Sequence, residues 1–116
     1  MRTGINIGVQ TKRTTKLGVG VPPSQKFELL ANTFKTLGDY SRVRIVSVLV
    51  QGEKCPGEIA LEVGLSPSAV SHHLKVLRKA NLVKVRREHR QIFYLLDDKH
   101  IYELFAAGVE HVEELI

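Results

Sequence analysis

Residues 55–79, CPGEIALEVGLSPSAVSHHLKVLRK, constrain the fold more than any other stretch of the chain. Pro56 and Pro67 each stand where a helix would begin, a position that tolerates proline because the first helical amide has no partner to lose. Gly64 is suited to ending the first helix and Ser66 to capping the second. Two short helices joined by this tight turn predict a helix-turn-helix. The expected inward-facing positions of the second helix are Val70, Leu74 and Leu77.

Two further helices are predicted upstream of this motif. Residues 24–37 carry apolar side chains at helical spacing, with Ser24 as the expected cap. Residues 41–51 follow with Ser41 as the expected cap, and a glycine comes directly after each of the two segments. The second of these helices is apolar almost all round, so we expect it to be the buried one.

The hydrophobic period changes from 3.6 to 2 after the helix-turn-helix. Alternation in residues 82–96 predicts two strands around the charged turn 87–90, and residues 98–115 return to helical spacing. Two helices, a helix-turn-helix, a hairpin and a last helix follow one another in the order of a winged helix. The sequence therefore predicts a mainly α fold with a small β-hairpin, a winged helix-turn-helix.

The first 23 residues differ from the rest of the chain. Residues 1–23 have four glycines, scattered positive charge and no hydrophobic period, so we expect a flexible basic tail before a single domain, residues 24–116. Cys55 is the only cysteine, which excludes a disulfide within the chain and favours a reducing compartment, the cytoplasm. We recognise no signal peptide and no run of roughly 20 apolar residues, so no membrane partner is expected.

Positive charge is concentrated in the helix-turn-helix and the hairpin. Residues 66–91 carry seven Lys or Arg against one acidic residue, which argues for a polyanionic partner. Small polar side chains at the start of the second helix could enter the major groove of DNA, and basic ones farther along it and at the hairpin tip could contact phosphates. The predicted contacts with double-stranded DNA are Ser66, Ser68, Ser71, His72, Lys75, Arg78, Arg86, Arg87, His89, Arg90 and Gln91. Each basic residue alone would indicate only a soluble surface, but their arrangement favours DNA binding.

The last 20 residues have the opposite charge and include metal-ligand residue types. Asp98 and His100 form one pair, and His111 and Glu114 form another. Carboxylates and imidazoles are ligands for zinc, but the two histidines are eleven residues apart, about 16 Å along a helix. One helix therefore cannot gather the four around one ion. Taken singly, each residue has another interpretation: a helix cap, an interface or solvent-exposed histidine, or one more charge on an acidic tail.

Three stretches of the sequence resemble the ArsR/SmtB family of bacterial repressors: LGDYSRVRIVSVL, LSPSAVSHHLKVLRKANLV and RREHRQIFYLL. The match runs from about residue 27 to the end, and SAVSHHLKVLRKANLV is its highly specific part. The resemblance implies a homodimer formed through the first and last helices. It also implies a repressor that occupies operator DNA when metal-free and leaves when an effector binds.

The resemblance also distinguishes two kinds of effector site. One kind uses two or more cysteines at the start of the helix that Cys55 opens; this chain has one, so we expect Cys55 to be a partly buried cap residue. The other kind lies on the last helix. There an Asp-x-His motif is followed, after ten residues, by His-x-x-Glu or His-x-x-His. That pattern is the one of the zinc-sensing subgroup. This chain matches it at every position, with Asp98, His100, His111 and Glu114.

Antiparallel pairing of two last helices would overcome the distance between the two ligand pairs. Asp98 and His100 of one copy would then face His111 and Glu114 of the other, which gives two sites per dimer. Two imidazoles and two carboxylates suit tetrahedral zinc, with cobalt or nickel as alternatives. A site with no open position is regulatory rather than catalytic.

Two other functions are compatible with parts of this pattern. The first is a winged-helix regulator with a non-metal effector or none, in which the acidic last helix only dimerises. The second, a small metalloenzyme, is not expected, because a catalytic zinc needs an open position and a nearby general base. The other histidines, His72, His73 and His89, lie in the predicted DNA-facing elements and are not ligand candidates.

Overall fold

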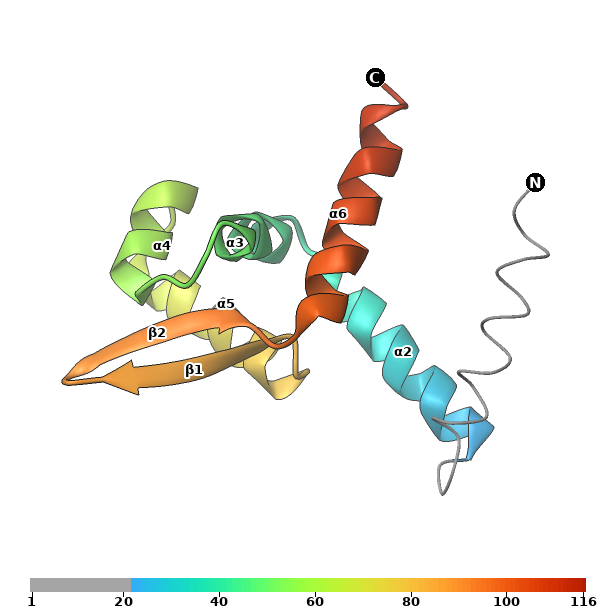
Figure 1. Ribbon diagram of the computed structural model, residues 1–116, viewed down its shortest axis with the longest axis horizontal. Coiled ribbons are helices and arrows are strands. Elements are labelled where there is room, and N and C mark those ends of the chain that lie inside the picture. The colour runs from blue at the N-terminus through green and yellow to red at the C-terminus, as the bar shows by residue number, and fades with distance from the viewer. Residues whose placement is uncertain (1–21) are drawn as a thin grey trace. The chain divides into compact units, whose positions relative to one another are not determined.

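The computed structural model describes residues 22–116, which fall into two units, residues up to Asn32 and Thr33–Ile116. The expected tail, residues 1–23, lies outside the described residues except for its last two. The expected order of helices and strands is confirmed (Figure 1). The elements are α2 (Pro23–Leu37), α3 (Tyr40–Val50), α4 (Pro56–Val63), α5 (Pro67–Lys79), β1 (Val83–Glu88), β2 (Gln91–Leu96) and α6 (Lys99–Glu113).

The starts of the first two helices differ from the expectation. Ser24 is not the cap of α2, because Pro23 is already helical and the Pro22 carbonyl accepts the first helical hydrogen bond, from the amide of Lys26. Proline has its φ angle preset for this first position. Ser41 is not the cap of α3 either. Asp39 caps that helix two residues earlier, and the Arg42 amide that donates to its carboxylate at 3.1 Å lowers the pKa of Asp39.

The helix-turn-helix follows the expectation residue by residue. Pro56 and Pro67 are the first residues of α4 and α5. Gly64 ends α4 with a φ angle of 70°, a left-handed conformation that glycine adopts without steric cost. The Ser66 hydroxyl caps α5 by accepting a hydrogen bond from the amide of Ala69 at 3.1 Å. Local sequence chemistry therefore fixes the turn that sets the direction of α5 relative to α4.

The core is aliphatic and centred on α3. This helix contributes four buried residues, as its apolar sequence predicts, and α4 and α5 pack against it. Full burial of each large aliphatic side chain contributes about 1.5–3 kcal/mol. The side chains with less than 2% exposure are Ile45, Val46, Ile59, Val70, Leu74, Leu77, Leu82 and Val83. The three inward positions expected for α5 are therefore confirmed.

The hairpin, called the wing below, has a shorter turn than expected. Its strands pair antiparallel from Val83 with Leu96 to Glu88 with Gln91. Only two residues, 89 and 90, remain for the turn, whereas the sequence suggested four, 87–90. His89 has a φ angle of 57° there, which histidine tolerates better than most residues. The shorter turn extends the paired part of the wing toward its tip.

α6 packs against the core along one side only. Ile101 and Phe105 contact the buried cluster, whereas Tyr102, Val109 and Val112 are exposed. The exposed side borders an apolar groove of about 450 Å³. Its lining includes Phe34 and Leu37 of α2, Val43 of α3 and Leu104, Val109 and Val112 of α6. In residues 22–116, no helix combines the length and apolar character that a membrane crossing requires.

Candidate nucleic-acid interface and candidate metal ligands

The first turns of α5 present the polar side chains that the sequence predicted at a DNA surface. Ser68, Ser71 and His72 are exposed, while the neighbouring Val70 and Leu74 are buried. Ser66 is exposed as well, but its hydroxyl oxygen is engaged as the helix cap and lies 3.3 Å from that of Ser68. The apolar face of α5 therefore packs on the core, and its opposite face exposes small polar side chains that a ligand could contact.

The second half of α5 is basic. Lys75, Arg78 and Lys79 are exposed and line one shallow hollow of about 420 Å³. Lys75 and Arg78 were predicted to contact phosphates, and Lys79 completes the same cluster. Three cations around a concave surface favour an anion such as a backbone phosphate.

His73 points to the interior side of α5 rather than to its exposed face. It is half-buried, and its Nδ1 lies 3.5 Å from Nη1 of Arg42 on α3. Arg42 also donates from Nε to the backbone carbonyl of Thr36 near the end of α2, at 2.7 Å. This guanidinium thus links the end of α2 to α5. This contact was not predicted from the sequence, although the two arginines on the largely apolar α3 were a usable sign.

We expect Arg42→Lys to lower the free energy of unfolding by about 1–3 kcal/mol, because a lysine cannot reproduce both contacts and hydrogen bonds to charged groups are worth that much. Urea denaturation measures the change. Arg44→Lys is the matched control, because the side-chain contact of Arg44 within residues 22–116 is with the Tyr40 ring, 5.7 Å away, over which a lysine ammonium can also lie. Equal effects of the two substitutions would contradict the linking role of Arg42.

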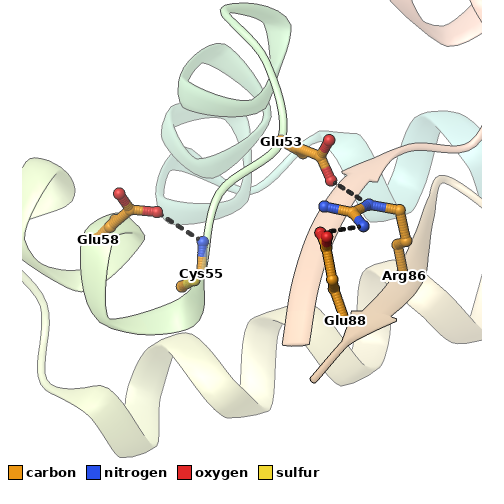
Figure 2. A network of polar contacts seen from close by, with 5 residues as sticks. All are labelled: Glu53, Cys55, Glu58, Arg86 and Glu88. Carbon is orange, nitrogen blue, oxygen red and sulfur yellow. Dashed lines mark hydrogen bonds and ion pairs between the residues drawn. The ribbon is translucent and has the colours of Figure 1, made fainter. Parts of the chain in front are cut away.

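The predicted DNA contacts in the wing have two kinds of surroundings. Arg87 and the tip residues His89, Arg90 and Gln91 are exposed. Arg86, in contrast, donates from Nε to Glu53 at 2.8 Å and from Nη1 to Glu88 at 2.7 Å, as Figure 2 shows. The hydrogen bond to Glu53, and to a smaller extent the one to Glu88, raises the pKa of the Arg86 guanidinium. No sequence pattern relates Glu53 to a residue 33 positions away, so this contact was not predicted.

Asp98 and His100 lie together at the start of α6. Asp98 caps the helix through Oδ1, which accepts from the amides of His100 at 2.9 Å and Ile101 at 3.2 Å. The other oxygen, Oδ2, lies 3.5 Å from Nδ1 of the His100 imidazole. Partial burial raises the pKa of Asp98, but the hydrogen bonds from Ile101 and His100 outweigh it and the net pKa is lowered. Capping therefore uses one oxygen of the carboxylate, and the other oxygen faces the His100 imidazole.

His111 and Glu114 lie at the opposite end of α6. His111 is in the last turn, Glu114 follows the helix as its C-terminal cap residue, and both are exposed. Within residues 22–116, no three His, Cys, Asp or Glu side chains come close enough to hold a metal ion. One chain thus brings together the first predicted pair but not all four residues. The donor set fits zinc only if a second chain completes it.

Cys55 is the N-terminal cap residue of α4 and is half-buried, as expected. Its amide donates to Oε1 of Glu58 at 2.8 Å (Figure 2). Partial burial, followed by the Glu58 carboxylate, raises the pKa of the Cys55 thiol. The thiolate, which is the form that binds metals, is therefore disfavoured.

The sequence is similar to those of known transcriptional regulators. Residues 39–85 match the family described as bacterial regulatory protein, arsR family. A transcriptional repressor SmtB homolog from Synechocystis is 40% identical over 85 residues, which cover 73% of this chain and 64% of that protein. A cadmium resistance transcriptional regulatory protein CadC homolog from Staphylococcus aureus is 36% identical over 87 residues, which cover 74% of this chain and 72% of that protein. The chain thus spans slightly less than two thirds of the first relative.

A solved structure from Mycobacterium bovis has the same fold. It is a homodimeric winged helix-turn-helix DNA-binding domain with a TM-score of 0.75 and 27% identity, and the match covers 78% of this chain and 84% of that one. The relatives are transcriptional regulators, a class without enzymatic activity. By its sequence matches and its fold, the chain belongs to the ArsR/SmtB family of metal-responsive bacterial transcriptional repressors.

Proposed function

We propose that this protein is a zinc-responsive repressor that binds operator DNA as a metal-free homodimer and is released when zinc binds between the two α6 helices. The observation that carries the proposal is the division of ligands on α6. Asp98 Oδ2 and His100 Nδ1 lie together at its start, and His111 and Glu114 lie at its end. Each end supplies half of a tetrahedral donor set, so two chains are needed for a complete one.

The proposed DNA surface comprises the exposed face of α5 and the tip of the wing. Ser68, Ser71 and His72 would reach base edges or nearby phosphates, because the start of a recognition helix enters the major groove. The basic residues farther along α5 and at the wing tip would contact the backbone. A DNA partner would place the protein in the cytoplasm.

The proposed dimer is supported by the apolar groove beside α6. An exposed apolar surface of this kind favours protein association. The Mycobacterium bovis relative is homodimeric. A twofold dimer with antiparallel α6 helices would cover Val109 and Val112 and set opposite ends of the two helices side by side.

In this dimer Asp98 and His100 of one subunit and His111 and Glu114 of the other would hold the ion. Zinc would supply a bond between the subunits at each end of the α6 pair. α6 packs on α3, which packs on α5, so constraint of α6 reaches the recognition helix through contacts of the core. Through this geometry or through reduced flexibility, the dimer would no longer present its two recognition helices at the operator spacing, which is a coupling between two sites.

The test is DNA binding by the metal-free protein and after addition of zinc, cobalt or nickel, with a duplex selected for tight binding from a random-sequence pool. We expect tight binding by the metal-free dimer and release by at least one of these metals. Binding that no metal alters would favour a regulator with a non-metal effector or none. Failure to bind any duplex would overturn the whole proposal.

Replacement of Ser71 or His72 by alanine should weaken binding to the selected duplex by about 1–3 kcal/mol, the usual value of one good contact to a base edge. Zinc stoichiometry should not change, because both residues lie on α5 and the proposed ligands lie on α6. Fluorescence anisotropy and metal titration measure the two quantities. Wild-type DNA affinity in both variants would show that the recognition surface is elsewhere.

The Cys55→Ser variant should still release DNA when zinc is added. Serine preserves a cap residue at the start of α4, and Glu58 can still accept from the backbone amide of residue 55. The zinc concentration that halves DNA binding should match that of the wild type. Loss of the zinc response would make Cys55 a metal ligand.

A further inference from the structure

Both strands of the wing are attached to one short segment, residues 53–55, which lies between α3 and α4. β2 is attached through the backbone: the Lys54 amide donates to the Tyr94 carbonyl at 3.0 Å, and the Tyr94 amide donates to the Lys54 carbonyl at 2.8 Å. β1 is attached through side chains, because Arg86 donates to the carboxylate of Glu53 at 2.8 Å (Figure 2). Neighbouring residues of one segment therefore hold both strands.

The same segment is attached to the helix-turn-helix on its other side. The Cys55 amide donates to Glu58 in the first turn of α4, and the Lys54 ammonium lies 3.7 Å from the Glu62 carboxylate in the next turn. Residues 53–55 thus connect the wing with the helix that precedes the recognition helix. A shift of the wing relative to α4 would break contacts on one side or the other.

Arg86 is poorly placed to contact a phosphate. Two of its donors are engaged by Glu53 and Glu88, and its guanidinium carbon lies 4.6 Å from the centre of the Phe93 ring. The local charge is −1, from two carboxylates and one guanidinium. Arg87, the next residue on β1, is exposed and points to the opposite side, as successive residues of a strand do.

We infer that Arg86 is a positioning residue, which with Glu53 fixes the wing relative to the helix-turn-helix so that the wing tip and α5 reach DNA together. Arg87 and the tip residues then supply the phosphate contacts of the wing. The inference rests on the proposed DNA-binding function and extends it. It removes Arg86 from the predicted contact residues and adds Glu53, an acidic residue that favours binding to a polyanion.

The first test depends on the sign of one effect. Glu53→Ala removes a negative charge close to the DNA surface, so electrostatics alone would tighten binding to the selected duplex. The positioning role predicts the opposite, a loss of about two- to fivefold, as expected when an exposed ion pair is broken. Tighter binding by Glu53→Ala would overturn the inference.

The second test compares two adjacent arginines through the salt dependence of binding. Each lost phosphate contact reduces the slope of log K against log salt by about 0.9, and a dimer loses two contacts per substitution. Arg87→Gln should therefore flatten the slope by about 1.8. Arg86→Gln should weaken binding without changing the slope, because the loosened wing still makes its phosphate contacts in the complex but must first be ordered. An equal reduction in the Arg86→Gln slope would make Arg86 a phosphate contact.

The third test needs no DNA, so it separates this inference from the proposed function. Hydrogen exchange of the Lys54 and Tyr94 amides in the free protein should accelerate by about two- to fivefold in both Glu53→Ala and Arg86→Gln. The double variant should exchange no faster than either single one, and Arg87→Gln should match the wild type. Unchanged exchange in the single variants would overturn the inference. A wild-type protein that binds no duplex would instead overturn the proposed function and leave this result standing.

Discussion

Two variants that each fail to bind zinc tightly should, after they are mixed, form heterodimers that bind one zinc ion each. The first variant combines Asp98→Ser with His100→Ala; serine keeps the helix cap and removes the carboxylate. The second combines His111→Ala with Glu114→Gln. In either homodimer every site keeps two ligands of four. A complete structural zinc site is worth about 10–16 kcal/mol, so loss of half its ligands should weaken binding by several orders of magnitude.

The heterodimer of these variants differs from both homodimers. One of its two sites has lost all four ligands, whereas the other combines the intact His111 and Glu114 of the first variant with the intact Asp98 and His100 of the second. Zinc titration of heterodimers purified through two different tags should therefore give one tight site. Two tight sites in either homodimer, or none in the heterodimer, would show that the site is not shared between chains.

Binding to the selected duplex should weaken by about three orders of magnitude when salt rises from roughly 50 to 200 mM. Each protomer presents Lys75, Arg78 and Lys79 on α5 and Arg87 and Arg90 on the wing. If three of these five contact phosphates, a dimer makes six contacts, and the slope of log K against log salt is about −5.4. A fourfold rise in salt then costs a factor of about 10³.

Equilibrium titrations at four or more salt concentrations, in the absence of zinc, measure this slope. Lys35→Gln, in the last turn of α2, is a control that should leave it unchanged, because Lys35 is not part of the proposed DNA surface. A flat salt response of the wild type would mean that the basic surface of α5 and the wing is not where DNA binds.

Local patterns in the sequence were sufficient to predict the helix-turn-helix. Pro56, Gly64, Ser66 and Pro67 specify helix ends through their own backbone chemistry, and the structure places all four as expected. The start of α3 was predicted wrongly for an equally local reason. The sequence GDYS offers two capping residues two positions apart, and the structure uses the aspartate.

Contacts between distant segments could not be read from the sequence. Glu53 and Arg86 come into contact because the chain returns through α4 and α5, and no periodicity in the sequence predicts such a contact. Arg42 and His73 are 31 positions apart and depend on the packing of α3 against α5. The spacing of the α6 ligand residues did show that one chain cannot complete a metal site. Their role, and that of the exposed residues on α5, stays a prediction.

The double use of Asp98 bears on how a sensor of this kind could acquire a new metal preference during evolution. Because Oδ1 holds the first turn of α6 and Oδ2 is the proposed ligand, a change of residue 98 alters the stability of the helix and the coordination chemistry together. Loss of a helix cap costs about 1 kcal/mol, and cysteine is not among the favoured capping residues. Glu114 follows the last turn of α6. Among the hydrogen bonds of residues 22–116, its backbone amide takes part in the cap, but its side chain does not. Replacement of Glu114 by a softer ligand would therefore cost less helix stability than the same replacement of Asp98.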